Sequence, residues 1–144
     1  MKPVDQTRFG FPDGNCFAAC VASLLDIGIE DVPDLGNWDS DWTRPLNRWL
    51  AGRGLAYIEV DTSTSTPYYR LPADLLVLLS GLSPRHLKTV EGEPVEHCVV
   101  GRADGSAGGH HFDIVHDPHP SRDGLAGRVT SVAFLLKLDP SSAR

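Results

Sequence analysis

The pattern of apolar and polar residues divides the chain into a helical first part and a strand-rich second part. Over 16–25, apolar and small residues run without a break, and the three alanines among them favour a buried helix over a strand. Gly28 is expected to end this helix, and 29–33 to form a short turn or helical piece. Over 39–51, apolar residues recur every three or four positions, which predicts an amphipathic second helix.

After residue 54 the period changes to that of strands. Strands are expected at 55–60, 75–79, 97–102, 112–116 and 128–138. The segment 75–79 is also compatible with a short helix, but Gly81 and Pro84 soon after it favour a strand. Polar loops are expected at 61–66 and 83–94. Helices that precede an antiparallel sheet make this an α+β chain.

The length of 144 residues fits a single domain, 1–144, with neither an internal repeat nor a linker. Proline and glycine punctuate 1–15, which predicts an irregular segment, and the tail 139–144 is expected to fray. No apolar run is long enough to span a bilayer, and the first residues do not resemble a secretory signal. These features predict a cytoplasmic protein without membrane contact.

Charge and cysteine content narrow the classes of partner. The formal net charge is −6 and no basic run stands out, which argues against nucleic acid as a partner. Three cysteines are an odd number, so a disulfide framework is not expected. Their spacing does not match a metal site, and we expect no cofactor. The sequence indicates no particular oligomeric state.

Cys16 is the cysteine whose position predicts reactivity. It stands in the first turn of the helix predicted over 16–25, with Asn15 as the expected N-cap. The unpaired N–H groups at a helix N-terminus favour a thiolate, and the backbone N–H of Cys16 could also face an oxyanion. Cys20 and Cys98 lie within apolar segments and are expected to be buried structural residues.

A general base and an orienting acid are predicted from the last hairpin. If the connection between strands 97–102 and 112–116 is symmetric about residue 107, then His97 and Asp117 lie opposite each other. They would then be within reach of a His–carboxylate hydrogen bond. A register shift of one residue would replace Asp117 by a neighbouring residue, His116 or Pro118.

The other histidines have less specific settings. His86, His110 and His111 lie in polar or glycine-rich loops and are expected to be exposed. His119 could be a turn residue or a substrate contact, and the turn is favoured. An alternative interpretation gathers the C-terminal histidines into the metal site of a hydrolase, with the candidate ligands His110, His111, His116 and His119.

Three motifs carry a family resemblance: GNCFAACVASLL at 14–25, EHCVVG at 96–101 and VHDPHP at 115–120. In this order they resemble the papain-like cysteine peptidases, nearest to the bacteriocin-processing, double-glycine leader peptidases. Small phage and actinobacterial proteins look similar. DGNC at 13–16 also resembles the opening of the ovarian-tumour deubiquitinases. The resemblance implies a papain-like fold with N-terminal helices packed on a C-terminal antiparallel sheet.

The resemblance also implies roles for individual residues. Cys16 would be the nucleophile, His97 its base and Asp117 the orienting acid, with Gln6 and the Cys16 backbone as the oxyanion hole. The expected activity is an acyl transfer that hydrolyses an amide bond of a peptide or protein, as in a peptidase or isopeptidase. Deamidation or transglutaminase-like transfer to an amine uses the same steps.

A second class of function stays open, namely an idle papain-like protein used for binding or phage assembly. Two departures from the family pattern favour it. Phe17 stands where the leader peptidases carry glycine, and Gly10 stands at the usual position of the oxyanion-hole glutamine, six residues before the cysteine.

Overall fold

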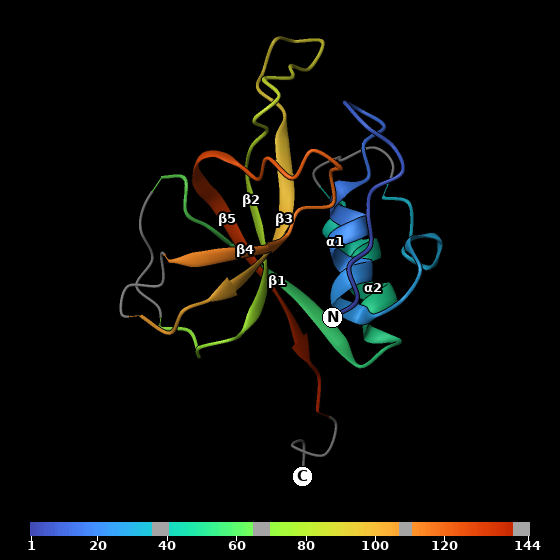
Figure 1. Ribbon diagram of the computed structural model, residues 1–144. Helices are drawn as coiled ribbons and strands as arrows, with labels where there is room; N and C mark the ends of the chain where they lie inside the picture. The colour runs from blue at the N-terminus through green and yellow to red at the C-terminus, as the bar shows by residue number, and fades with distance from the viewer. Residues whose placement is uncertain (36–40, 65–69, 107–110, 140–144) are drawn as a thin grey trace.

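The computed structural model describes residues 1–35, 41–64, 70–106 and 111–139 (Figure 1). The elements in chain order are α1 (Cys16–Leu25), η1 (Ile29–Asp31), α2 (Thr43–Ala51), β1 (Leu55–Asp61), β2 (Leu76–Leu82), β3 (Glu96–Ala103), β4 (Phe112–His116) and β5 (Ala126–Lys137). Helices precede strands, and every pairing between the strands is antiparallel. The prediction of an α+β chain is confirmed.

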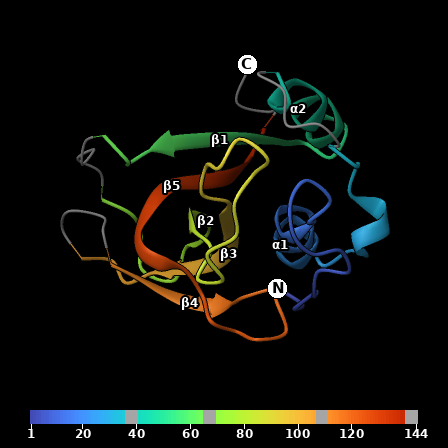
Figure 2. The same ribbon diagram turned by 90° about the horizontal axis from the view of Figure 1, so that it is seen from above.

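The five strands form one sheet in the order β1-β5-β2-β3-β4. Strand β5, the last in the sequence, lies inside the sheet between β1 and β2, and it therefore links β1 to the rest of the sheet. The sheet is strongly curved, with β1 at one end and β4 at the other (Figure 2). Strand β3 lies next to α1.

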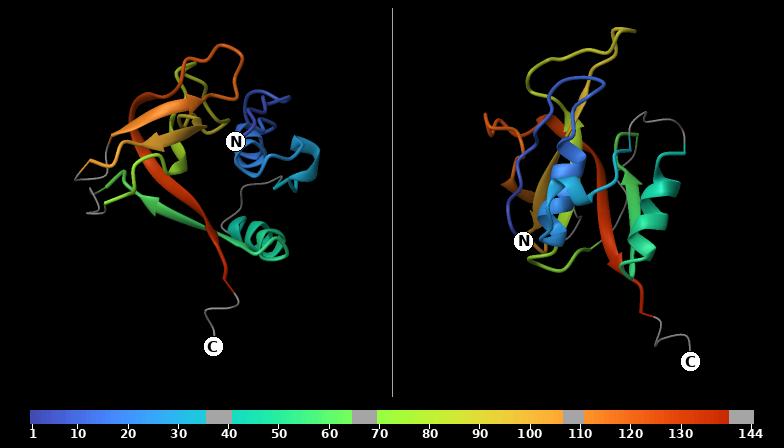
Figure 3. Two further views of the ribbon diagram at one scale, coloured as in Figure 1. Left: turned by 60° about the horizontal axis from the view of Figure 1, so that its bottom comes forward. Right: turned by 90° about the vertical axis from the view of Figure 1, so that its right-hand side faces the viewer.

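Both helices lie on the same side of the sheet (Figure 3). Helix α1 packs on β3 and helix α2 on β1. The core between these layers is built from both helices and alternate strand residues, and its fully buried members include Val21, Leu46, Leu50 and Val100. Trp42 and Trp49 pack against this core, as the helical spacing predicts.

The opposite face of the sheet is also buried. Residues of the other parity along the strands form a second apolar cluster there, made of Val77, Leu79, Val99 and Val132. Partly buried side chains such as Leu71, Leu125 and Phe134 pack against it. Because both faces of β2 and β3 are covered, these strands read as continuous apolar runs instead of alternating ones.

The helix predictions are confirmed, with two corrections at the ends. Helix α1 has the predicted bounds, but Asp26 caps its C-terminus in the left-handed conformation, with φ 56°, and Gly28 is extended. Helix α2 begins at Thr43, after a turn at 41–42, and the predicted start at residue 39 lies outside the described residues. The short helical piece predicted at 29–33 is η1.

Four of the five predicted strands are confirmed to within two residues. Strand β2 is the exception, because it continues three residues beyond the predicted end. Gly81 lies inside it, at a shift of register with β5, where an added Cβ would be 3.1 Å from the carbonyl oxygen of Arg128. Gly81 therefore permits a close approach of two strands and does not end β2.

The N-terminal segment up to residue 14 contains neither helix nor strand, as predicted. It runs along α1 and leads into the loop before that helix (Figure 1). Of the predicted frayed tail, 140–144 lies outside the described residues. Within the described ranges, none of the helices is long and apolar enough to cross a membrane.

Candidate active site

Cys16 is the first residue of α1 and is partly exposed. Asn15 is the N-cap, and its carbonyl accepts the backbone N–H of Ala19 at 3.0 Å. Its side chain does not cap the helix, contrary to expectation. The amide oxygen accepts the backbone N–H groups of Thr7 and Arg8 at 3.0 and 2.9 Å instead. The first N–H groups of α1 therefore donate no hydrogen bond to the side chain of their cap and keep their preference for negative charge beside Cys16.

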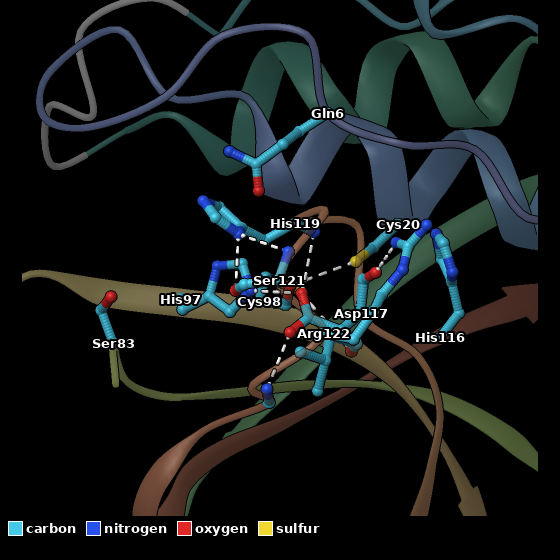
Figure 4. A network of polar contacts seen from close by, with 12 residues as sticks. Gln6, Cys20, Ser83, His97, Cys98, His116, Asp117, His119, Ser121 and Arg122 are labelled. Atoms are coloured by element: carbon cyan, nitrogen blue, oxygen red, sulfur yellow. Dashed lines mark hydrogen bonds and ion pairs between the residues drawn. The ribbon is translucent and has the colours of Figure 1, made fainter. Parts of the chain in front are cut away.

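His97 and Asp117 form a buried pair. His97 is the second residue of β3 and Asp117 follows the last residue of β4, and each is only 4% exposed. The Nε2–H of His97 donates to Oδ1 of Asp117 at 2.8 Å (Figure 4). The predicted hydrogen bond between these two residues is thus confirmed, and it leaves Nδ1 as the free ring nitrogen of His97.

The predicted strand register behind that contact is wrong. In the structure Arg102 pairs with Asp113, which centres the hairpin half a residue later than assumed. A bulge between Val100 and Gly101 then shifts the register by one more position. Asp117 nevertheless reaches His97, because it lies beyond the end of the ladder, where the chain turns toward β3.

Asp117 is held by three hydrogen bonds in all. Its Oδ1 also accepts the backbone N–H of His119 at 2.9 Å, and its Oδ2 accepts the backbone N–H of Gly124 at 2.7 Å. Burial raises the pKa of this carboxyl, but the bonds from His97, His119 and Gly124 outweigh it and lower the pKa to about 2. Asp117 is therefore a fixed anion at neutral pH.

The His97 imidazole lies between Asp117 and Cys16. Burial opposes its protonation, but hydrogen bonds and charge interactions with Asp117 and Cys16 raise its pKa to about 8. Cys16 and His97 also line the same two hollows. The three residues predicted to form a triad are therefore brought together, from α1, β3 and the turn after β4.

The first of these hollows has a volume of about 390 Å³ and is lined by the rings of Phe17, Trp42 and Tyr57. We call it the aromatic hollow. The second, the Gln6 hollow, has a volume of about 360 Å³, and its lining includes Gln6 and His119. The loop before α1 and the connection from β2 to β3 contribute walls to both hollows.

Gln6 lies in the same hollow as Cys16 and His97, although it is ten residues before the cysteine. Its backbone N–H donates to the carbonyl of Pro118 at 3.0 Å, and its side chain is 7% exposed. Its Nε2 donates one hydrogen to the carbonyl of Arg8 at 2.8 Å. Its Oε1 is buried without a hydrogen-bond partner, so only the second hydrogen on Nε2 is available to an oxyanion.

The turn after Asp117 brings His119 next to His97. His119 lies in a turn, as predicted, and its Nδ1 accepts the backbone N–H of Ser121 at 3.1 Å. Its ring also meets the His97 ring edge-on, with centroids 6.4 Å apart, and lines the Gln6 hollow. Burial and the charge of Arg85 lower its pKa. The sequence signal for this turn was the spacing of Asp117 and His119, since an aspartate side chain often accepts the backbone N–H two residues later.

A second group of contacts ties the N-terminal segment to this turn. The Nε2–H of His116 donates to the carbonyl of Val4 at 2.8 Å. Arg122 makes a bidentate ion pair with Asp5, with N–O distances of 2.7 and 2.8 Å. It also donates to the carbonyl of Asp117 (Figure 4). The residues just before Gln6 are thereby joined to residues on either side of Asp117.

The other two cysteines are structural, as predicted. Cys20 and Cys98 are buried, and the Sγ of Cys20 donates to the carbonyl of Cys98 at 3.4 Å. Burial, followed by the neighbouring Cys98, raises the pKa of the Cys20 thiol well above its ordinary value. Cys16 is the partly exposed cysteine of the three.

The alternative metal site receives no geometric support in the described ranges. There, no three His, Cys, Asp or Glu side chains are arranged to hold an ion. His116 and His119 bond different partners, Val4 and Ser121, and His110 lies outside the described residues.

Comparisons with family models, with curated proteins and with solved structures give no match to this chain.

Proposed function

We propose that the chain is a papain-like, cysteine-dependent acyl-transfer enzyme that hydrolyses an amide bond of a peptide or protein. The observation that carries the proposal is the placement of His97. One ring nitrogen is fixed by a buried aspartate at 2.8 Å, and the ring contacts a cysteine that opens a helix. An imidazole held in this way is suited to take a proton from the thiol and to return it to a leaving group.

The reaction proceeds in two halves. His97 takes the proton of the Cys16 thiol, and the thiolate attacks the carbonyl carbon of the substrate, whose oxygen becomes an oxyanion. The imidazolium of His97 then protonates the leaving amine, the C–N bond breaks and a thioester remains on Cys16. In the second half His97 takes a proton from water, which attacks the thioester and releases the carboxylic acid and the thiol.

Two donors are placed to stabilise the oxyanion. The Cys16 backbone N–H belongs to the N-terminus of α1, where helix N–H groups have no intrahelical partner. The remaining hydrogen on Nε2 of Gln6 is the second donor, from the other wall of the Gln6 hollow. Deamidation of a glutamine side chain follows the same route, with ammonia as the leaving group.

Alkylation of the thiols tests the proposal without a known substrate. We expect iodoacetamide to label Cys16 much faster than Cys20 or Cys98 below pH 7, because the imidazolium of His97 favours the thiolate. In His97→Ala the Cys16 profile should move toward that of an ordinary thiol, at a pH of about 8.5. Peptide mass spectrometry reads each cysteine separately. A Cys16 profile that is ordinary in both proteins would contradict the proposal and favour an idle binding protein.

A further inference from the structure

The aromatic hollow has a floor of three aromatic rings that contact one another edge-on. The ring centroids of Phe17, Trp42 and Tyr57 are 5.4 to 5.7 Å apart, with interplanar angles of 62° to 81°. Phe17 and Tyr57 are buried, and Trp42 is partly exposed. Aromatic rings attract cations most strongly where the site excludes water.

Two carboxylates line the same hollow, that of Glu59 on β1 and that of Glu96 at the start of β3. Oε1 of Glu59 accepts the hydroxyl of Ser131 at 2.7 Å, and Oε1 of Glu96 accepts the hydroxyl of Thr130 at 2.8 Å. Within the described ranges, neither glutamate forms an ion pair. The hydroxyl groups hold the carboxylates in place without neutralising them.

The charge of the lining is one-sided. The residues that line the aromatic hollow include Glu59 and Glu96 but neither lysine nor arginine. The Gln6 hollow shares Cys16, His97 and Glu96 with the aromatic hollow and has Arg85 in its lining. The aromatic hollow therefore has two carboxylates and neither lysine nor arginine, whereas the Gln6 hollow has one carboxylate and an arginine, and a cationic side chain of a substrate is favoured in the aromatic hollow.

We propose that the aromatic hollow binds a positively charged side chain of the substrate, a lysine or arginine within two residues of the bond that is cleaved. Its alkyl stem would lie on the Phe17, Trp42 and Tyr57 rings, and its cationic end would meet Glu59 and Glu96. This inference rests on the proposed function, because it takes the hollow beside Cys16 as part of the substrate site.

Peptidyl acyloxymethyl ketones test the inference. The Cys16 thiolate displaces the carboxylate of such a reagent and forms a thioether, so the rate reports how well the peptide is placed. Three peptides differ only in one side chain, lysine, norleucine or glutamate, either next to the ketone or one residue before it. At one of these positions we expect the lysine reagent to react fastest and the glutamate reagent slowest.

Substitution of the carboxylates locates the preference. Glu59→Gln and Glu96→Gln keep a carbonyl to accept the Ser131 and Thr130 hydroxyls, and each should lower the lysine-to-norleucine rate ratio by roughly fivefold. The ratio is taken within each variant, so a change that affects both reagents equally cancels. Asp113→Asn makes the same change of net charge on β4, outside both hollows, and should leave the ratio as it is.

Two results would overturn the inference, and they are distinguishable from failure of the proposed function. Equal rates for lysine and norleucine at a readily labelled Cys16 remove the cation pocket and leave the reactive thiol standing. If none of the reagents labels Cys16, the enzyme proposal fails. Calorimetry then measures the affinities of the same peptides without the leaving group, and these affinities test the pocket by themselves. A lysine preference that depends on Glu59 and Glu96 supports the pocket, and equal affinities overturn it.

Discussion

The charges of His97 and Asp117 are balanced by each other, because both side chains are buried. The pKa of His97 is raised to about 8 from 6.5, so the stability it contributes is fully present below pH 6.5 and is lost as the pH rises through 8. The pKa of Asp117 is lowered to about 2 from 3.8, so its contribution is present above pH 3.8 and is lost as the pH falls through 2. The pair is therefore strongest between about pH 4 and pH 6.5.

The first prediction concerns stability at alkaline pH. The difference in free energy of unfolding between wild type and His97→Gln should fall by about 2 kcal/mol between pH 6 and pH 9, because a shift of one pKa unit is worth about 1.4 kcal/mol. Urea denaturation at a series of pH values measures this difference. His86→Gln is the control for the loss of a histidine, since His86 is exposed, and the fall for His97→Gln should exceed any change seen in this control. A constant difference for His97→Gln would contradict the assigned pair.

The second prediction concerns Asp117→Asn. The carboxylate accepts three N–H groups, from His97, His119 and Gly124, and an amide has only one oxygen with which to accept them. The variant should lower the pKa of His97 from about 8 toward its ordinary value or below it, and should slow Cys16 labelling by the ketone reagents by roughly a hundredfold or more.

Nuclear magnetic resonance titration of the His97 ring, in wild type and Asp117→Asn, measures the change directly. The ring protons of His86 give a reference in the same spectra. An unchanged His97 pKa would show that Asp117 does not set the charge of the base.

At the level of single elements, the loop before α1 is organised by the side chain of Asn15. An asparagine before a helix predicts a side-chain cap, but here the amide folds back onto the incoming loop and binds Thr7 and Arg8. That loop begins at Gln6 and ends at Cys16. The same side chain therefore sets the position of Gln6, the proposed oxyanion donor, relative to Cys16.

The third prediction separates the hydrogen bonds that the Asn15 side chain accepts in the loop from the effect of charge at this position on Cys16. Asn15→Ala leaves two backbone N–H groups without a partner and should cost about 2 kcal/mol of unfolding free energy. Asn15→Asp keeps the acceptor oxygens and should stay close to wild type in stability. It also places a negative charge beside Cys16 at the start of α1, and should slow iodoacetamide labelling of Cys16 at pH 7 by a few fold.

Urea denaturation and peptide mass spectrometry give the two readouts. Equal stability of Asn15→Ala and wild type would contradict the role of Asn15 in the loop, and faster labelling of Asn15→Asp would contradict the electrostatic argument.

Elements could be predicted from the sequence where their apolar and polar pattern lies within a few neighbouring residues. The bounds of α1 and β4 followed from an unbroken apolar run and from short alternation. The sequence did not predict features that depend on a neighbouring strand. Gly81 continues β2 because another backbone passes close to it, and the bulge at Val100 depends on the partner strand. The contact between His97 and Asp117 was correct although its register was not, since the two residues lie at the same end of the hairpin.

At the scale of the whole molecule, the candidate site depends on contact between the N-terminal segment and the turn after β4. The segment that carries Gln6 is joined to the turn after β4, more than 100 residues later, by the Arg122–Asp5 ion pair and the bond from His116 to Val4. A local sequence pattern contains no information on such a contact. The sequence therefore indicated Gln6 only through the family resemblance, and gave no reason for its place in the hollow.

The fourth prediction is that this link matters more for the site than for stability. Both partners of the Arg122–Asp5 pair are about half exposed, so Arg122→Ala should cost at most about 1 kcal/mol of unfolding free energy. The same change releases the segment before Gln6 and the carbonyl of Asp117. Labelling of Cys16 by the norleucine ketone should slow by roughly tenfold, because misplacement of a positioning group by a fraction of an ångström is costly.

Arg44→Ala is the matched control, because the Arg44–Asp41 pair is another exposed ion pair, at the start of α2 and outside both hollows. It should change neither the labelling rate nor the stability by a measurable amount. If Arg122→Ala slows labelling no more than Arg44→Ala does, the two ends of the chain are held by the other contacts, and the ion pair is only a surface feature. A large loss in Arg122→Ala without unfolding would instead show that the geometry of Cys16, His97 and Gln6 is fixed from outside the site.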